Sequence, residues 1–282
     1  PTQGFGYTTL MTNNGKMVNR GVEITLSGEI IRQKDFSWNA SLLYAFNRNK
    51  VKHISVQPSL WDSRISMPTS YLMVGKPLYG IYAYKWAGLN ENGDPQVYDA
   101  ENNVTSGPAR DYHALVYCGT TVPIHNASLT NVLRYKGLEF SAMLILDAGH
   151  KLRSSNIPSI NMSNGRITST AKGIVDRWTQ SGDVTDVPRL LFSNDTENFN
   201  THRTELYRYS DLFVYDASNI RLSNISLAYR VPAHWCKKIS LSGARLQFNV
   251  ENVATFAFDS KANYDLGGKV KPNYVWGLYL NF

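Results

Sequence analysis

The stretch Asn273-Tyr-Val-Trp-Gly-Leu-Tyr-Leu-Asn-Phe282 decides the fold. Successive side chains of a β-strand point to opposite faces, so every second residue shares a face. One face is wholly apolar and carries Tyr274, Trp276, Leu278, Leu280 and Phe282. Ten residues at about 3.4 Å each, tilted by about 45°, rise about 24 Å, close to the apolar band of a membrane-spanning barrel. The stretch indicates a barrel strand, although by itself it also fits an edge strand of a soluble sandwich.

Six further stretches alternate in the same way and fall into pairs. The expected strands cover about 20–31 and 36–47, then 127–135 and 138–148, then 218–230 and 241–253. In the fifth of these, the apolar phase switches between Leu222 and Ile225. One extra residue would cause such a switch, so we predict a β-bulge near Ser223 and Asn224.

The connections between these strands alternate between short and long. Short turns are expected near 32–35, 136–137 and 231–240, and long loops, with hairpins of their own, near 48–126, 149–216 and 254–272. Short turns at the inner end and long loops at the outer end are typical of outer-membrane barrels. Charged residues within the strands fall opposite the apolar face, as lipid contact requires; they are Glu23, Glu29, Arg134, Glu139, Asp147, Arg245 and Glu251.

The number of strands predicts that the chain is part of something larger. Bacterial single-chain barrels have an even number of strands and at least eight, whereas seven would leave open edges in lipid. The sequence also starts Pro1-Thr2-Gln3, with no charged and apolar leader. We therefore expect an all-β chain that forms the C-terminal portion, about seven strands, of a larger transmembrane antiparallel β-barrel.

The composition excludes several other classes of protein. Aromatic residues make up 12% of the chain and charged residues only 18%, below the roughly 25% usual for soluble domains. The net charge of +7 is scattered without a basic run, so we expect no nucleic-acid binding. No stretch approaches 18 consecutive apolar residues, which excludes a transmembrane helix. Cys118 and Cys236 lack metal-binding spacing and are expected to be buried or free thiols.

Several ordered motifs between about residues 15 and 282 resemble the SusC/RagA-type TonB-dependent transporters. They are Asn19-Arg-Gly-Val-Glu23, Gly75-Lys-Pro77, Tyr82-Ala-Tyr-Lys-Trp-Ala-Gly-Leu89, Gly93-Asp-Pro95, Asp176-Arg-Trp-Thr179, Asp216-Ala-Ser-Asn-Ile-Arg-Leu-Ser-Asn-Ile-Ser-Leu-Ala-Tyr229 and Val250-Glu-Asn252, followed by the terminal aromatic strand. That strand also resembles the signal read by the barrel-assembly machinery of Gram-negative bacteria, carried here by Tyr274, Trp276, Leu278, Leu280 and Phe282.

The resemblance implies a plugged 22-stranded barrel in the lipid of the cell outer membrane. The plug domain and the earlier strands are absent from this chain. In the family, a SusD-like lipoprotein covers the outside loops and TonB pulls on the plug. The implied function is import of oligosaccharides or peptides. The alternative is a soluble or surface-exposed all-β module that binds a ligand.

No motif in the sequence points to catalysis. The six histidines lack metal-binding spacing, and neither a nucleophile motif nor a phosphate-binding loop occurs. We therefore expect no enzyme activity, cofactor or metal. Ligand contacts are instead expected from aromatic residues of the long loops, which give a large contact area at low entropic cost. The candidates are Trp61, Tyr71, Tyr98, Tyr112 and Trp178, which could alternatively pack the loops together.

Overall fold

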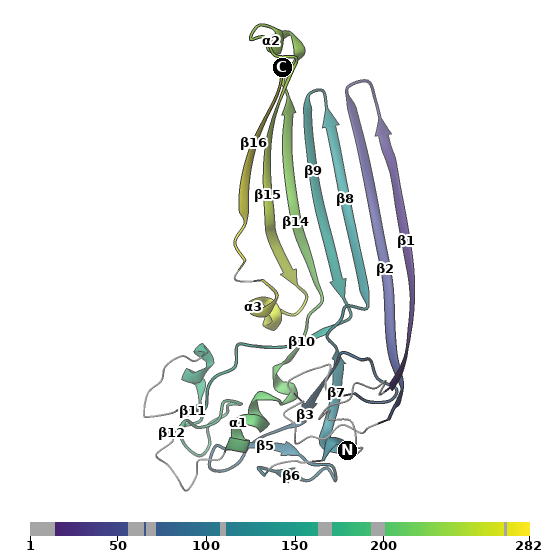
Figure 1. Ribbon diagram of the computed structural model, residues 1–282. Helices are drawn as coiled ribbons and strands as arrows, with labels where there is room; N and C mark the ends of the chain where they lie inside the picture. Colours follow the sequence, from purple (N-terminus) through teal and green to yellow (C-terminus); the bar gives the residue numbers. More distant parts are fainter. Residues whose placement is uncertain are drawn as a thin grey trace, which may run out of the picture.

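A computed structural model describes residues 15–55, 65, 72–107, 111–162, 171–192, 201–267 and 270–282. Its main feature is one tall antiparallel sheet, with the long loops gathered below one end (Figure 1). The sheet has seven strands in the order β1 (Gly15–Arg32), β2 (Phe36–Ile54), β8 (His125–Tyr135), β9 (Leu138–Ala148), β14 (Asn219–Arg230), β15 (Gly243–Ala257) and β16 (Asn273–Asn281). This confirms the fold class and the number of strands that the sequence predicts.

The apolar face of the sheet is exposed. Leu26 in β1, Leu246 in β15 and Trp276 in β16 are 62%, 50% and 78% exposed. Strand pairing places apolar residues side by side across the sheet. Leu227 of β14 lies opposite Phe248 of β15, which lies opposite Trp276 of β16. A soluble sandwich would bury this face against a second sheet. The exposure therefore favours the membrane barrel over the sandwich.

The opposite face carries the charged and polar side chains, which bond to one another across strands. Arg134 in β8 donates to Glu139 in β9 at 2.7 Å, and Arg245 in β15 reaches the same carboxylate at 3.2 Å. Arg221 in β14 donates to Asp147 in β9 at 2.7 Å. The strand charges thus lie on the face where the sequence pattern places them.

Two pairs of polar side chains on the apolar face are hydrogen-bonded to each other. The Trp38 indole donates to the side-chain oxygen of Asn131 at 3.1 Å, and the Tyr44 hydroxyl lies 2.8 Å from Nδ1 of His125. A polar group in hydrocarbon without a partner would cost several kcal/mol. These pairs let the face remain compatible with lipid.

Two local expectations can be compared directly with the strand pairing. The register of β14 shifts between Leu222 and Asn224 against both neighbours, which confirms the bulge. The strands β1 and β2 run further than the apolar pattern indicated, because Gly15–Arg20 pairs with the polar segment 48–54. Backbone hydrogen bonds extend a hairpin whether or not its side chains alternate, so the first long loop starts at 55 rather than 48.

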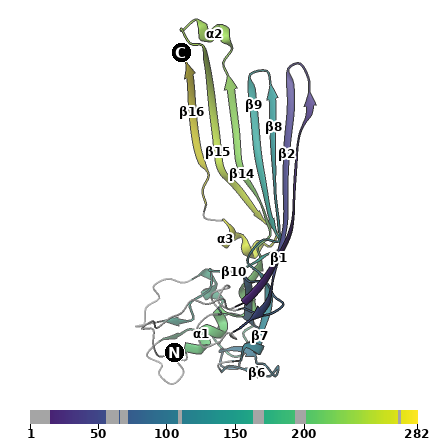
Figure 2. The same ribbon diagram turned by 45° about the vertical axis from the view of Figure 1, so that its right-hand side comes forward.

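The two ends of the sheet differ in their connections. At one end the connections are short, and the longest contains the five-residue helix α2 (Ala233–Lys237). At the other end lie the first long loop (55–124), the second (149–218) and the third (258–272) (Figure 2). None of the helices within the described ranges is long and apolar enough to span a membrane.

The long loops contain structure of their own. The first holds β3 (Gly80–Tyr84), β4 (Trp86–Leu89), β5 (Pro95–Tyr98), β6 (Val104–Thr105), the 3-10 turn η3 (Tyr112–Ala114) and β7 (Leu115–Thr120). The second holds β10 (Lys151–Arg153), β11 (Asn161–Met162), η4 (Lys172–Asp176), β12 (Leu191–Phe192), α1 (Thr201–Arg208), η5 (Asp211–Phe213) and β13 (Val214–Asp216). The third holds η6 (Ser260–Ala262) and α3 (Asn263–Leu266).

Candidate functional site: the joined long loops

The first and second long loops share one hydrophobic core. Tyr82 and Val97 of the first loop are fully buried and pack with Leu206 from helix α1 of the second loop. A second cluster contains Tyr207, and Trp86 packs against both clusters. Main-chain contact adds to this, since the Tyr84 amide donates to the Tyr209 carbonyl at 2.9 Å. The two loops therefore form one packed body rather than two separate extensions.

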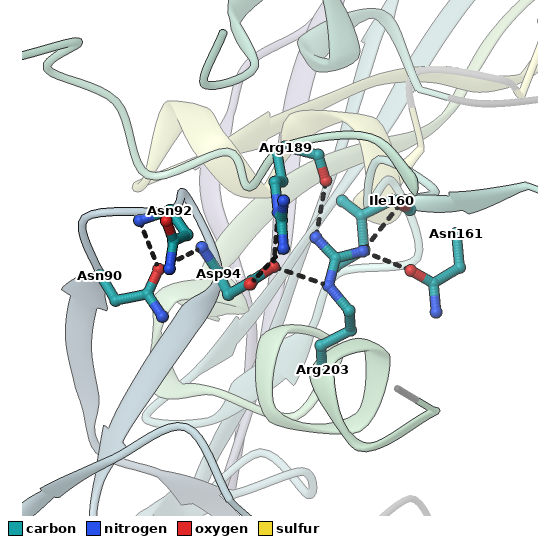
Figure 3. A network of polar contacts seen from close by, with 7 residues as sticks. All are labelled: Asn90, Asn92, Asp94, Ile160, Asn161, Arg189 and Arg203. Atoms are coloured by element: carbon teal, nitrogen blue, oxygen red, sulfur yellow. Dashed lines mark hydrogen bonds and ion pairs between the residues drawn. The ribbon is translucent and has the colours of Figure 1, made fainter. Parts of the chain in front are cut away.

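An ionic cluster centred on Asp94 joins the same two loops (Figure 3). Arg189 donates to both carboxylate oxygens of Asp94, from Nε at 3.0 Å and from Nη2 at 2.7 Å. Arg203 in α1 donates from Nε to Oδ1 at 3.1 Å. Two-pronged arginine–carboxylate contacts of this kind are among the stronger hydrogen bonds in proteins. Asp94 thus fixes the tip of the β4–β5 hairpin to the second loop.

Arg203 is the most deeply buried member of this cluster, because only 4% of its side chain is exposed. It also donates to the Ile160 carbonyl at 3.1 Å, the Arg189 carbonyl at 2.7 Å and the side chain of Asn161. Burial lowers the pKa of its guanidinium, and the charge of Asp94 opposes that change. A buried charge with a hydrogen-bond partner at each of its three nitrogens holds several segments in one geometry.

The hairpin tip itself is a tight turn stabilised by Asn90. Its side-chain oxygen accepts from the Asn92 and Asp94 amides at 3.0 and 2.8 Å. Gly93 has a φ of +74°, and a Cβ there would lie 2.3 Å from the indole of Trp178. Only glycine therefore fits between the turn and the indole. This turn joins β4 to β5, and two arginines hold the Asp94 carboxylate beside it.

Arg153 makes a second joint between these loops. Its guanidinium donates to the Tyr82 carbonyl at 2.7 Å and to the Ser210 carbonyl at 3.3 Å, and it lies 5.3 Å from the ring of Tyr209.

Cys118 lies close to Arg153, and burial, followed by the charge of Asp211, raises the pKa of the Cys118 thiol to about 11. Both cysteines are free, as expected, and Cys118 stays protonated at neutral pH. This cysteine is therefore packed rather than reactive.

The third long loop is fastened to the second through Asp265 in α3. Its carboxylate accepts from the Ser154 hydroxyl at 2.7 Å and from the amide and hydroxyl of Ser155 at 2.9 and 2.7 Å. Lys261 adds a contact 5.9 Å from the centroid of the Tyr215 ring. All three long loops are thereby linked.

The base of the second loop is tied to the sheet by the short ribbon of β10 and β13. Lys151 and Asp216 form an ion pair across this ribbon at 3.0 Å. Burial raises the pKa of Asp216, but hydrogen bonds from Ser218 and Lys151 outweigh burial and hold the pKa at about 2. The carboxylate is therefore ionised at neutral pH, and the pair persists at the sheet end.

The five aromatic candidates do not all fall within the described residues. Trp61 and Tyr71 lie outside them, and Tyr112 lies in η3, where only its backbone is described. Tyr98 ends β5, with the Lys85 ammonium 4.6 Å from the centroid of its ring. Trp178 covers Gly93. Tyr98 thus lies at the C-terminal end of β5, whereas Trp178, from the second long loop, lies against the turn that precedes β5. Both side chains are half-buried.

The structure also reveals joining residues that the sequence reading did not single out, namely Arg153, Arg189, Arg203 and Asp265. Asp94 and Trp178 belong to motifs named in the sequence analysis. Their sequence did not indicate that Trp178 packs against Gly93 or that Asp94 binds arginines of the second loop. The sequence signal for this ionic cluster is weak, because Arg189 and Arg203 lie about 100 residues from the Gly93-Asp94 turn. In the described ranges, no group of three or more His, Cys, Asp or Glu side chains is arranged to hold a metal ion.

Comparison with known proteins gives relatives of one kind. No family model matches the chain. The chain is 24% identical to TonB-dependent receptor P3 of Formosa agariphila, over 97% of this chain and 28% of the receptor. It is 22% identical to the TonB-dependent receptor SusC of Bacteroides thetaiotaomicron, over 88% of this chain and 24% of SusC. The chain thus spans about a quarter of the length of these relatives.

The fold has counterparts among solved structures. It matches a chain of the RagAB peptide transporter with a TM-score of 0.72 and 21% identity, over 98% of this chain and 31% of that chain. A chain of the RagAB peptide importer in its "open-open" state matches with a TM-score of 0.68, also at 21% identity, over 95% of this chain and 29% of that chain. This chain is therefore a relative of the SusC/RagA-type TonB-dependent receptors, and it matches a fragment of their barrel.

Proposed function

We propose that the chain is the C-terminal part of a TonB-dependent nutrient importer in the cell outer membrane. The observation that carries this proposal is the polarity of the seven-stranded sheet. Its apolar face is exposed, and the charged side chains on its other face bond to one another. An Arg or Lys at the lipid midplane costs about 2–4 kcal/mol, so a lipid-facing wall needs this arrangement. The receptor and importer relatives support the same function and are not enzymes.

The rest of the importer follows from this proposal. A plug and further strands would come from the remainder of a full-length protein and would complete a barrel of 22 strands. TonB would act on that plug from the periplasm. The barrel-assembly machinery would read the aromatic strand β16, with Tyr274, Trp276, Leu278, Leu280 and Phe282 on one face. The outside loops would be the three long loops at 55–124, 149–218 and 258–272.

The joined long loops are the proposed ligand surface, under a SusD-like lipoprotein. The substrate would be an oligosaccharide or a peptide, and the RagAB neighbours are described as peptide importers. Aromatic side chains would contact it, with Trp61, Tyr71, Tyr98, Tyr112 and Trp178 as candidates. The packed core and the Asp94 cluster support this role, because they hold the loop surface in one geometry before a ligand arrives.

The proposal is tested with the full-length protein in a Gram-negative host that lacks other importers of this type. Uptake of fluorescent oligosaccharides and fluorescent peptides is measured with TonB present and absent. We expect saturable uptake of one of the two classes, and its loss without TonB. A protein that fractionates with the soluble proteins, or uptake that does not depend on TonB, would overturn the proposal.

The ligand surface is tested separately. Tyr98→Ala and Trp178→Ala should weaken ligand binding if these rings contact the ligand, whereas Trp235→Ala, in the short connection at the other end of the sheet, is the matched control. Because Trp178 also covers Gly93, its variant is checked for intact loops by protease sensitivity. Unchanged affinity in both loop variants would remove these two residues as ligand contacts.

A further inference from the structure

The second long loop leaves the sheet through a short joint, where the end of β9 lies beside the start of β14. The Ala217 amide donates to the His150 carbonyl at 3.0 Å, and the Gly149 amide donates to the Ser218 hydroxyl at 3.0 Å. His150 is buried in this joint, with only 9% of its surface exposed. The joint therefore fixes how the second long loop, with its part of the Asp94 cluster, is held on the sheet.

Two buried polar atoms of the joint lack a hydrogen-bond partner in the part of the chain that the structure describes. They are Nδ1 of His150 and Oδ1 of Asn219, and they do not bond to each other. Asn219 is 3% exposed, and its amide nitrogen donates to the Ala217 carbonyl at 2.8 Å. Most buried polar atoms in proteins are paired, so two unpartnered atoms in one joint are unusual.

The protonation state of His150 decides what this arrangement costs. A neutral imidazole can leave Nδ1 without a proton, whereas an imidazolium carries a proton on both ring nitrogens. Protonation would therefore create a charged group in a buried place, with a donor at Nδ1 that has no acceptor.

Asp147, at the end of β9, is the first of two carboxylates whose charge acts on His150. Its Oδ1 accepts from the Asn126 side chain at 2.7 Å, and its Oδ2 accepts from Arg221 at 2.7 Å. Each oxygen thus has a donor already, and the Arg221 guanidinium offsets the charge of the carboxylate. Asp147 is therefore a poor partner for a protonated His150.

Asp216 of β13 is the second carboxylate, and its oxygens are engaged in the same way. Oδ1 accepts from the Ser218 amide at 2.8 Å, and Oδ2 accepts from the Lys151 ammonium at 3.0 Å. The pKa of Asp216 is about 2, so this carboxylate stays ionised in mild acid. A change of the joint in mild acid would therefore not come from Asp216.

Two further elements that pack near the joint carry titratable or charged groups. His125 of β8 lies next to Gly149, since a Cβ on that glycine would be 3.4 Å from Cδ2 of His125. Nδ1 of His125 already lies 2.8 Å from a tyrosine hydroxyl. The third long loop brings Lys261 to 5.9 Å from the centroid of the Tyr215 ring in β13, and the charge of Asp259 acts on the same tyrosine. His125 is therefore the group that a test must separate from His150.

We propose that His150 makes this joint sensitive to pH, so that the second long loop is held firmly at neutral pH and loosens in mild acid. Burial lowers the pKa of His150 by more than the charges of Asp147 and Asp216 raise it. The closed joint therefore prefers the neutral imidazole. Its stability is complete above about pH 6.5, the ordinary pKa of histidine, and declines as the pH falls from there to the lowered pKa.

The consequence for a ligand rests on the proposed function, because the second long loop supplies Trp178 and the arginines of the Asp94 cluster to the proposed ligand surface. A looser joint costs this surface its fixed geometry, so ligand affinity should fall in mild acid. The pH-sensitive joint itself depends only on contacts within this chain.

The test follows hydrogen exchange of the segments 149–153 and 214–218 in the purified full-length protein at about pH 7.5 and about pH 5. Each rate is divided by the rate of an unfolded chain at the same pH. We expect protection to fall by up to about thirtyfold, because one histidine changes an equilibrium by at most tenfold for each pH unit below about 6.5. His150→Gln, which cannot be protonated, should show equal protection at both pH values. His125→Gln, and His234→Gln at the other end of the sheet, should respond as the unaltered protein does.

A second measurement covers a His150→Gln variant whose joint is open at both pH values. NMR of the histidine side chains in isotope-labelled protein gives the pKa of the signal that His150→Gln removes, and we expect it below the ordinary value of 6.5. A pKa at or above that value would overturn the proposal. Protection that ignores pH, that falls equally in His150→Gln, or that no longer responds in His125→Gln would overturn it too. Loss of TonB-dependent uptake at neutral pH would instead contradict the importer and leave the pH-sensitive joint standing.

Discussion

The sheet and the long loops use apolar residues in opposite ways. In the sheet, Leu26 and Trp276 are 62% and 78% exposed, and the strand charges bond to one another on the other face. In the loops, Tyr82 and Leu206 are 1% exposed, and Arg203 is buried among carbonyl oxygens. The sheet exposes its apolar side chains, whereas the loops bury theirs, as a soluble domain does.

The two regions are held together by different kinds of interaction. A loop core in water is stabilised by apolar burial and depends on its buried charges being paired. A sheet in lipid gains little from contact between its outer side chains and depends on a face free of charge. The same substitution should therefore have different effects in the two regions.

The largest effect is expected when the buried charge of the loops is removed. Arg203→Met removes one donor each from the Ile160 and Arg189 carbonyls and leaves Asp94 with one arginine instead of two. Breaking a buried ion pair costs about 3–5 kcal/mol. In the full-length protein, hydrogen exchange of 80–98 and 201–213 should accelerate by more than about a hundredfold, while exchange of the sheet stays unchanged.

Arg208→Met is the control for this change. Arg208 lies in the same helix α1 but is exposed, and its guanidinium contributes mainly through the helix dipole, which is about 0.3–1 kcal/mol. If both variants accelerate exchange equally, the Asp94 cluster does not hold the loops together. If the sheet also loses protection, the two regions are not independent.

The next largest effect is expected from a charge on the lipid face. Phe248→Arg places a guanidinium between Leu227 and Trp276 and should cost about 2–4 kcal/mol. Asn249→Arg puts the same charge on the opposite face of the same strand, beside Ser226. We expect Phe248→Arg to reduce the amount of folded barrel in the outer membrane, measured by gel mobility without boiling, and Asn249→Arg to have little effect. Equal loss in both would contradict the assignment of the faces.

The sequence was sufficient to predict the sheet because its pattern is local. Alternation over ten residues identifies a strand and its faces, as in the terminal strand, and a phase change identifies the bulge at Ser223 and Asn224. The predicted start of β2 at Phe36 is confirmed, but its predicted end at 47 was wrong, because the segment 48–54 pairs through its backbone and carries no regular alternation.

The loops could not be predicted in the same way because their contacts are distant in sequence. Arg203 and Asp94 are 109 residues apart, and Asp265 and Ser154 are 111 apart. Neither pair has a spacing that predicts contact. The aromatic residue Trp178 was selected from its type alone, and type does not reveal that one face of its ring covers Gly93. Such contacts follow from tertiary structure only.

A smaller effect is expected at the hairpin tip. Gly93→Ala would bring a Cβ to 2.3 Å from the Trp178 indole at a φ of +74°. Strain of this kind costs about 1–3 kcal/mol. Gly88→Ala is the matched control, since its φ is +96° but nothing lies within 4 Å. Protease sensitivity of the segment 171–192 should rise more in Gly93→Ala. An equal rise would mean that backbone strain alone, and not the indole, requires glycine.

The smallest effect is expected from the ion pairs on the charged face of the sheet. Glu139 accepts from Arg134 and Arg245, whose side chains are 52% and 40% exposed. Exposed pairs of this kind contribute about 0–1 kcal/mol. Glu139→Gln should therefore lower the free energy of unfolding of the full-length barrel, measured in denaturant, by less than about 1 kcal/mol, with a smaller loss in high salt. A loss as large as that of Arg203→Met would mean that this face of the sheet is dry in the complete barrel. The sheet and the loops would then differ in whether their apolar side chains point outward or inward, and not in whether water reaches their charged groups.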